Sequence, residues 1–247
     1  MSEQDFTKIG REYDQIYRAK MSDLEAITLD VLETLKPDKK VKVCDVGAGT
    51  GLVADLLKQA GWNFDYLGIE PSALYEQLKD RVGIEKSLRD TSDLLKSFNG
   101  SFDAVIYSKS LHEILISKLL AHYKLESNKD LHDLYLQESD SYQSRKQLAL
   151  REVLEDSFNS LRPTGFVVVS DMEYPDYLSK ITISESVKYV YQTFKHLNYR
   201  EQTLPIIEIE TAIETTPWRI IDRRETAKRK DPNIKTKVYS LAIQKVM

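Results

Sequence analysis

The spacing of hydrophobic positions changes along the chain and predicts alternating helices and strands. Over residues 22–35, apolar side chains recur every three or four positions, as in a helix with one buried face. Short and nearly continuous apolar runs follow at residues 41–46, 66–69, 102–107 and 166–170. Runs of this length are typical of strands that are covered on both faces. Helical patterns separate them, so we expect βαβ units and a parallel sheet.

Weaker patterns extend this sheet. A further strand is expected near residues 86–89. Residues 218–223 and 237–243 read as two strands with no helical pattern between them, which predicts an antiparallel pair at one sheet edge. Residues 206–213 fit a helix and a strand equally well.

Two stretches are too long to be simple connections. Residues 112–150 and 174–214 both carry helical patterns. Insertions at the carboxyl edge of a parallel sheet are a usual place for substrate-binding elements. We therefore expect one domain over residues 1–247, in which these two insertions cap the substrate site.

A glycine-rich loop joins the first predicted strand to a helix. Residues 45–51 read Asp-Val-Gly-Ala-Gly-Thr-Gly. Gly47, Gly49 and Gly51 allow a tight turn and the close approach of a ligand, and the free N–H groups at the helix start can meet polar groups. Glu70 ends the next strand, nineteen residues after Gly51. A carboxylate there can accept hydrogen bonds from both hydroxyls of a ribose.

The loop departs from the dinucleotide fingerprint G-x-G-x-x-G, because its glycines are spaced G-x-G-x-G. It also has a carboxylate, Asp45, two residues before the first glycine. That charge would repel a pyrophosphate and attract an ammonium group. The pattern favours a ribose ligand with a cationic or zwitterionic end, such as S-adenosylmethionine, and disfavours an NAD-binding oxidoreductase.

Four segments, taken in order, resemble the class I S-adenosylmethionine-dependent methyltransferases. The family's glycine motif is similar to residues 43–51, and its second strand with the acidic end is similar to residues 66–72. Its fourth strand with the following helix is similar to residues 102–114, and its fifth strand with the preceding turn is similar to residues 161–171. The resemblance implies an α/β fold with a seven-stranded, mostly parallel sheet, helices on both faces, an antiparallel C-terminal hairpin and helical cap insertions. It also implies an enzyme whose cofactor is S-adenosylmethionine.

The resemblance implies a role for individual residues at the cofactor. Asp45 would help to hold the amino group, and the three loop glycines would line the methionine part. Glu70 would bind the ribose hydroxyls, and Pro71 would pack near the adenine. Further cofactor contacts are implied for Asp90, Thr91, Ser108, Lys109 and Tyr13.

His112 is the candidate general base. It lies just past the fourth predicted strand, near the place of the transferred methyl group, and a histidine there can accept a proton at neutral pH. The alternative is a histidine that shapes the pocket or makes a local hydrogen bond. Asp171, just past the fifth predicted strand, is expected at the same mouth of the sheet as a pocket-lining, substrate-binding residue.

The N-terminal segment is a candidate lid. Tyr13 and Tyr17 lie on one face of an amphipathic stretch, and the corresponding segment of similar methyltransferases closes over the cofactor. Residues 1–36 would then form a helical lid that excludes water. The alternative is that these tyrosines pack a helix on the sheet. Tyr17 and Tyr174 are candidate substrate contacts.

Composition and charge limit the kinds of substrate and binding partner that we expect. The net charge is −4, there is one cysteine, and no apolar run is long enough to span a bilayer. We expect a cytoplasmic enzyme without a metal or membrane partner that methylates an oxygen or nitrogen of a small molecule, and homodimerisation is left open. A basic tract at residues 219–230 keeps an RNA or protein methyltransferase as an alternative, although the acidic balance disfavours nucleic acid. A non-catalytic S-adenosylmethionine-binding protein is the other alternative.

Overall fold

A computed structural model gives the arrangement of most of the chain. It describes residues 23–72, 74–82, 87–88, 92–126, 130–131, 139–173, 204–231 and 234–245. Several residues of the sequence predictions lie outside this description: Tyr13, Tyr17, Asp90, Thr91 and Tyr174, with most of the expected lid and of the second insertion.

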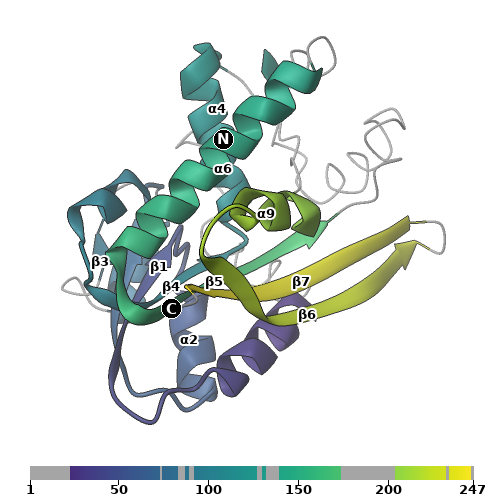
Figure 1. Cartoon of the computed structure of the whole chain (residues 1–247). Coiled ribbons are helices and arrows are strands. Elements are labelled where there is room, and N and C mark those ends of the chain that lie inside the picture. The colour runs from purple at the N-terminus through teal and green to yellow at the C-terminus, as the bar shows by residue number, and fades with distance from the viewer. Residues whose placement is uncertain are drawn as a thin grey trace.

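A mixed sheet of seven strands forms the centre of the α/β fold, in the order β3-β2-β1-β4-β5-β7-β6 (Figure 1). Six strands have six residues or more, and β3 has two. The strands are β1 (Val41–Val46), β2 (Phe64–Ile69), β3 (Ser87–Leu88), β4 (Phe102–Ser108), β5 (Leu161–Glu173), β6 (Trp218–Asp231) and β7 (Ile234–Lys245).

Strand direction confirms part of the prediction and corrects part of it. Neighbours from β3 through β5 pair in parallel, whereas β7 is antiparallel to both β5 and β6. The predicted edge hairpin is therefore confirmed. The sheet is mixed rather than mostly parallel, because β7 inserts between β5 and β6 and makes both of its pairings antiparallel.

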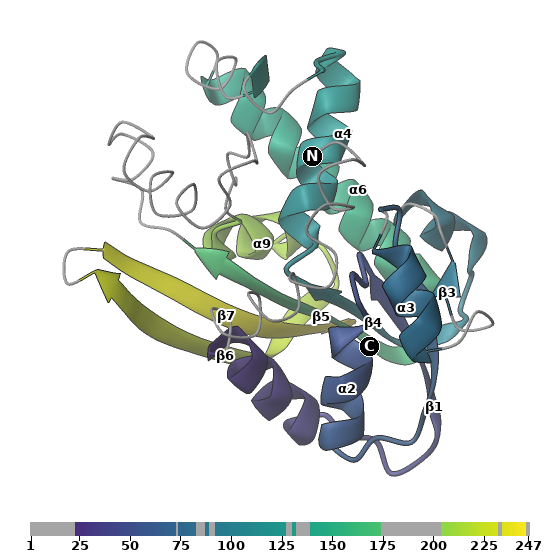
Figure 2. The same ribbon diagram turned by 180° about the vertical axis from the view of Figure 1, so that it is seen from behind.

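Helices cover both faces of the sheet, as Figures 1 and 2 show from opposite sides. Alternate residues of β4 separate the two layers: Val105 and Tyr107 join the core under α4, α6 and α9, while Ala104 and Ile106 join the core under α2 and the helix at residues 23–34. The helices are α2 (Leu52–Gln59), α3 (Tyr75–Val82), the 3-10 helix η2 (Ser92–Ser97), α4 (Leu111–Tyr123), α6 (Ser139–Ser160) and α9 (Ile206–Ile213).

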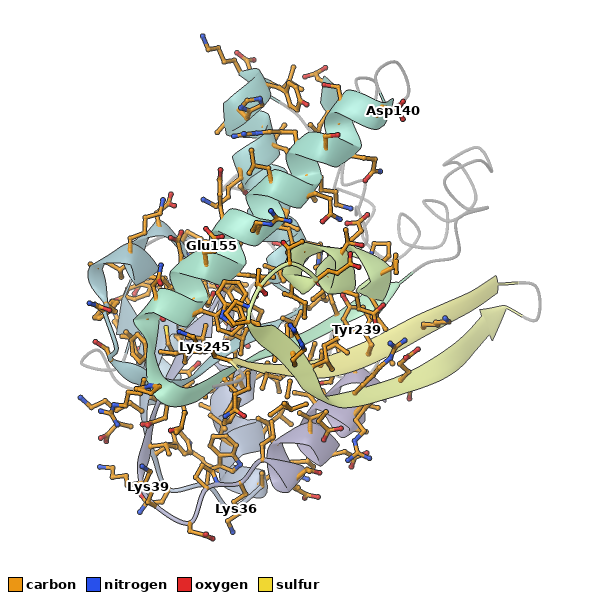
Figure 3. The ribbon with its side chains drawn as sticks, in the orientation of Figure 1. Lys36, Lys39, Asp140, Glu155, Tyr239 and Lys245 are labelled. Carbon is orange, nitrogen blue, oxygen red and sulfur yellow. The ribbon has the colours of Figure 1, made fainter. Side chains whose placement is uncertain are left out.

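Residues 206–213, which the sequence left ambiguous, form α9. Its buried Ile206, Ile209 and Ile213 recur at helical spacing on the side that faces the core. The hydroxyl of Tyr239, labelled on β7 in Figure 3, donates a hydrogen bond of 2.6 Å to the carbonyl of Leu204. This bond ties the start of α9 to the sheet.

Strand β5 begins earlier than its apolar run. Leu161 pairs with Phe102, and the register then shifts before Phe166 pairs with Ala104. The Pro-Thr-Gly turn expected before the strand therefore lies inside it as an irregularity. An ion pair between Arg162 Nη1 and Asp103 Oδ2, at 2.9 Å, holds this part of the strand against β4.

Helices α4 and α6 project beyond the sheet as a pair (Figures 1 and 2). Figure 3 labels Asp140 near the outer end of α6 and Glu155 nearer the sheet. Ile116 and Leu119 of α4 and Tyr142 of α6 form part of a separate apolar cluster between them. The described part of the first predicted insertion thus contains two helices with a small apolar core between them.

Candidate cofactor and active site

The carboxyl ends of four parallel strands meet at one edge of the sheet. Val46 at the end of β1 pairs with Ile69 at the end of β2, and Ser108 at the end of β4 pairs with Ser170 of β5. Strand order reverses between β1 and β4, and open α/β sheets bind their ligands in the crevice outside such a switch point. The fold therefore gathers most of the predicted site residues that it describes at one edge.

The glycine loop needs glycine at three positions. Gly47, Gly49 and Gly51 have φ angles of +70°, +55° and +88°, in the left-handed region that side chains disfavour. The N–H of Gly47 donates to the carbonyl of Ile69 at 2.8 Å, which anchors the loop to β2. A methyl group on Gly47 would lie 2.4 Å from the Cβ of Ser110, the residue before α4. The loop and the start of α4 therefore pack in direct contact.

Gly47→Ala is expected to lower the free energy of unfolding by about 2–5 kcal/mol, since a strained φ and an overpacked contact add. Gly100→Ala is the matched control, because Gly100 also has a positive φ, +58°, but has nothing within 4 Å of an added Cβ. That variant should lose only about 1–2 kcal/mol. Urea denaturation measures both, and equal losses would show that the contact with Ser110 is not tight.

Glu70 is locked beside the open side of the loop. Its Oε2 accepts a hydrogen bond from the N–H of Gly49 at 2.7 Å, and its Oε1 accepts one from the N–H of Ser72 at 2.8 Å. An added Cβ at Gly49 would meet none of the described residues within 4 Å, so the main chain there borders open space in the described part of the chain. Each carboxylate oxygen can accept a further hydrogen bond. Pro71, which follows Glu70, is exposed.

Asp45 is fully buried beneath the loop. Its Oδ2 accepts a hydrogen bond from the hydroxyl of Tyr66 at 2.5 Å, and among the residues that the structure describes its Oδ1 has no hydrogen-bond partner. Burial raises the pKa of Asp45 to about 7; the bond from Tyr66 opposes this rise, and the charge of Glu70 adds to it. A buried carboxylate oxygen without a partner fits a ligand that brings a positive hydrogen-bond donor.

His112 and Asp171 form a buried pair. His112 lies in the first turn of α4, and its Nδ1 is 2.8 Å from Oδ2 of Asp171 on β5. Both side chains are almost fully buried, and Oε1 of Glu113 lies 3.9 Å from His112 Nε2. Sequence reasoning placed both residues at this mouth of the sheet but did not pair them. A carboxylate on Nδ1 fixes the orientation of an imidazole ring and its tautomer.

Ser108 and Lys109 follow the same edge. Ser108 is half-buried at the end of β4. Lys109 has a φ of +56°, and its N–H donates to the carbonyl of Ser170 at 2.7 Å. A non-glycine residue in this conformation is uncommon, and such residues cluster at functional sites.

The start of the basic tract is partly neutralised by acidic neighbours. Arg223 pairs with Glu210 at 2.6 Å and with Glu225, and Arg224 pairs with Asp222 at 3.0 Å. This pairing matches a solvated strand edge better than a surface for phosphate. In the part of the chain that the structure describes, no helix is long and apolar enough to cross a bilayer. Within the same residues, no cluster of histidine, cysteine and acidic side chains could hold a metal ion.

Comparisons with known proteins identify the family. A search of curated proteins returns no match. Many solved structures share the fold. One is an S-adenosylmethionine-dependent methyltransferase of Geobacter sulfurreducens in complex with S-adenosylhomocysteine (11% identity, 90% of each chain covered, TM-score 0.50). Two others are an S-adenosylmethionine-dependent methyltransferase of Leishmania major (10% identity, 91% of this chain and 74% of that chain covered, TM-score 0.52) and the mitomycin 7-O-methyltransferase (14% identity, 100% of this chain and 61% of that chain covered, TM-score 0.51). The family described as "Methyltransferase domain" matches residues 17–208. The chain belongs to this family and is a S-adenosylmethionine-dependent methyltransferase.

Proposed function

We propose that this methyltransferase methylates an oxygen or nitrogen atom of a small molecule, with His112 as general base. The observation that carries this proposal is the buried contact between His112 Nδ1 and Asp171 Oδ2, at the carboxyl ends of β4 and β5. S-adenosylmethionine, when bound, supplies a methyl group on a positively charged sulfur. An acceptor hydroxyl must lose its proton during the transfer, and a protonated acceptor nitrogen must lose its proton before it can attack, so a base near the site serves either acceptor.

The residues at the loop fit this cofactor. Asp45 offers a buried oxygen without a partner for the ammonium group. Gly49 leaves open space beside the main chain, and Glu70 stands next to it with acceptor capacity for ribose hydroxyls. Contacts of Pro71, Ser108 and Lys109 with the cofactor, and those of Asp90, Thr91 and Tyr13, belong to the same proposal.

In proton transfer, His112 would accept the proton, and Asp171 would orient the ring and stabilise its positive charge. Asp171 accepts the Nδ1–H bond and so leaves Nε2 as the proton-accepting nitrogen. When an acceptor atom takes the methyl group that the bound cofactor would supply, with the thioether of the cofactor as the leaving group, the acceptor's proton would move to Nε2 of His112. Asp171, and Glu113 at 3.9 Å, stabilise the positive charge that the ring then carries.

The insertions would supply the acceptor pocket. Helix α4 begins at the edge that holds His112, and α6 runs from the outer end of the pair back toward the sheet, so residues 112–150 would cover an acceptor. Residues 174–214 and the lid at residues 1–36, with Tyr17 and Tyr174, would complete the cap. The described parts of these segments, the helix at residues 23–34 and α9, contribute to the cores on the two faces of the sheet, so the remaining residues would cover the acceptor. A cytoplasmic location belongs to this proposal, and homodimerisation stays an open prediction.

Methyl-labelled S-adenosylmethionine tests the acceptor class. The protein is incubated with separate small-molecule, RNA and protein fractions, and the labelled fraction is identified. We expect label in the small-molecule fraction alone, at least tenfold above a no-enzyme background. Label in RNA or protein would overturn the small-molecule acceptor, and S-adenosylhomocysteine binding without label in any fraction would favour the non-catalytic alternative.

A further inference from the structure

Tyr66 reaches Asp45 across a glycine. In the parallel pairing of β1 and β2, Asp45 lies opposite Gly68, and Tyr66 is two residues earlier on the same face. A methyl group on Gly68 would lie 3.0 Å from Cε1 of Tyr66. The missing side chain therefore leaves the space that the tyrosine ring needs to reach the carboxylate.

The carboxylate of Asp45 is therefore hydrogen-bonded through only one of its two oxygens, as far as the described residues show. Tyr66 is buried, and its hydroxyl donates to Asp45 Oδ2 at 2.5 Å. Oδ1 is enclosed by protein, yet no described residue gives it a hydrogen-bond partner. A buried acceptor without a donor costs free energy, so its persistence calls for a ligand group that completes it.

We propose that Tyr66 is a positioning residue for the cofactor: it fixes Asp45 through Oδ2 so that Oδ1 receives the ammonium group of the ligand. The inference rests on the cofactor site proposed above. It assigns a role to a residue that contacts no ligand itself and that sequence reasoning passed over. Its signal in the sequence is the pairing of an aromatic residue with a glycine two positions later on the strand beside Asp45.

Electrostatics strengthens the role of the tyrosine. The groups around the Asp45 carboxylate are Tyr66 on β2, Glu70 after β2 and Cys44 on β1. Burial raises the pKa of Asp45 to about 7, the hydroxyl of Tyr66 lowers it, and Glu70 raises it. Without the hydroxyl, the pKa of Asp45 would rise further, and less of the carboxylate would be ionised to meet an ammonium group.

Tyr66→Phe and a pair of ligands test the proposal by calorimetry. S-adenosylhomocysteine carries the ammonium group, whereas 5′-methylthioadenosine has the same adenosine and thioether without the amino acid. We expect the Kd of S-adenosylhomocysteine to rise about tenfold or more near neutral pH, as for a lost bond to a charged group, and the Kd of 5′-methylthioadenosine to stay unchanged. Asp45 with a pKa of about 7 loses its proton between about pH 6 and pH 8, so the affinity of the wild-type protein for S-adenosylhomocysteine should rise about tenfold over this range. The affinity for 5′-methylthioadenosine should not change with pH.

Tyr107→Phe is the matched control. Tyr107 is also a fully buried strand tyrosine, but its hydroxyl bonds Ser157 of α6 at 2.7 Å, away from the loop. It should leave both affinities unchanged. Because Tyr66 acts through Asp45, adding Tyr66→Phe to Asp45→Asn should cost little further affinity.

The outcomes separate this inference from the cofactor site itself. Equal weakening of both ligands, or no weakening of either, would overturn the role of Tyr66. An additive double variant would also overturn it, because it would mean that Tyr66 acts independently of Asp45. If wild type bound neither ligand, the cofactor site would be wrong in the first place.

Discussion

Glu70→Ala is expected to remove the stabilisation that S-adenosylhomocysteine gives to the wild-type protein. A ligand at about 100 times its Kd raises the free energy of unfolding by about 2.7 kcal/mol. Two hydrogen bonds from ribose to a carboxylate are worth together about 3 kcal/mol or more, so the variant should bind about 100-fold more weakly. At the same ligand concentration, only about 0.4 kcal/mol of stabilisation would remain.

The measurement is a thermal shift, taken for each variant against its own ligand-free Tm. This reference matters because Glu70 also accepts the N–H groups of Gly49 and Ser72, so its loss destabilises the free protein. Glu76→Ala is the control, since Glu76 is an exposed residue of α3 whose partner is Lys79 at 2.7 Å. Glu76→Ala should keep the full shift. A full shift in Glu70→Ala would remove Glu70 from the cofactor site.

The sequence predicts those features whose signals are local. The glycine loop and Glu70 lie within a short stretch, and each has a spacing that only a few chemistries require. Strand and helix periods are local as well, which is why the alternation of elements predicts an α/β fold. The position of His112 follows from the same logic, because it comes directly after a clear strand.

Features that depend on strand order are not visible in the sequence. Asp171 meets His112 only because β5 lies beside β4, a neighbour relation that joins residues 59 positions apart. Tyr66 meets Asp45 only in one register of β1 and β2, and a slip by one residue would place it on the other face. The mixed sheet has the same origin, since the insertion of β7 beside β5 leaves no mark on either strand's apolar pattern.

Irregular backbone conformation is the other feature that the sequence does not predict. The sequence predicts a turn just before the apolar run at residues 166–170, yet β5 already begins at Leu161, and Arg162 pairs with Asp103 on the neighbouring strand. The left-handed conformation of Lys109 has no sequence signal either, because that conformation is typical of glycine. Both follow from contacts with neighbouring strands rather than from local preference.

His112→Ala is expected to lower kcat for methyl transfer by about 100- to 10,000-fold, the usual contribution of a general base. Its affinity for S-adenosylhomocysteine should stay within about twofold of wild type, because the ring is not proposed to hold the cofactor. Asp171→Asn should lower kcat as well, since an amide in place of the carboxylate favours the wrong tautomer of the ring. Initial rates on the labelled acceptor and calorimetry on the same preparations separate these effects.

His122→Ala is the matched control, because His122 lies on the same helix but is exposed, with its ring against Tyr123. It should leave kcat unchanged. If His112→Ala kept the wild-type rate, the acceptor would lose its proton without help, and the pair with Asp171 would be a packing contact that ties α4 to β5.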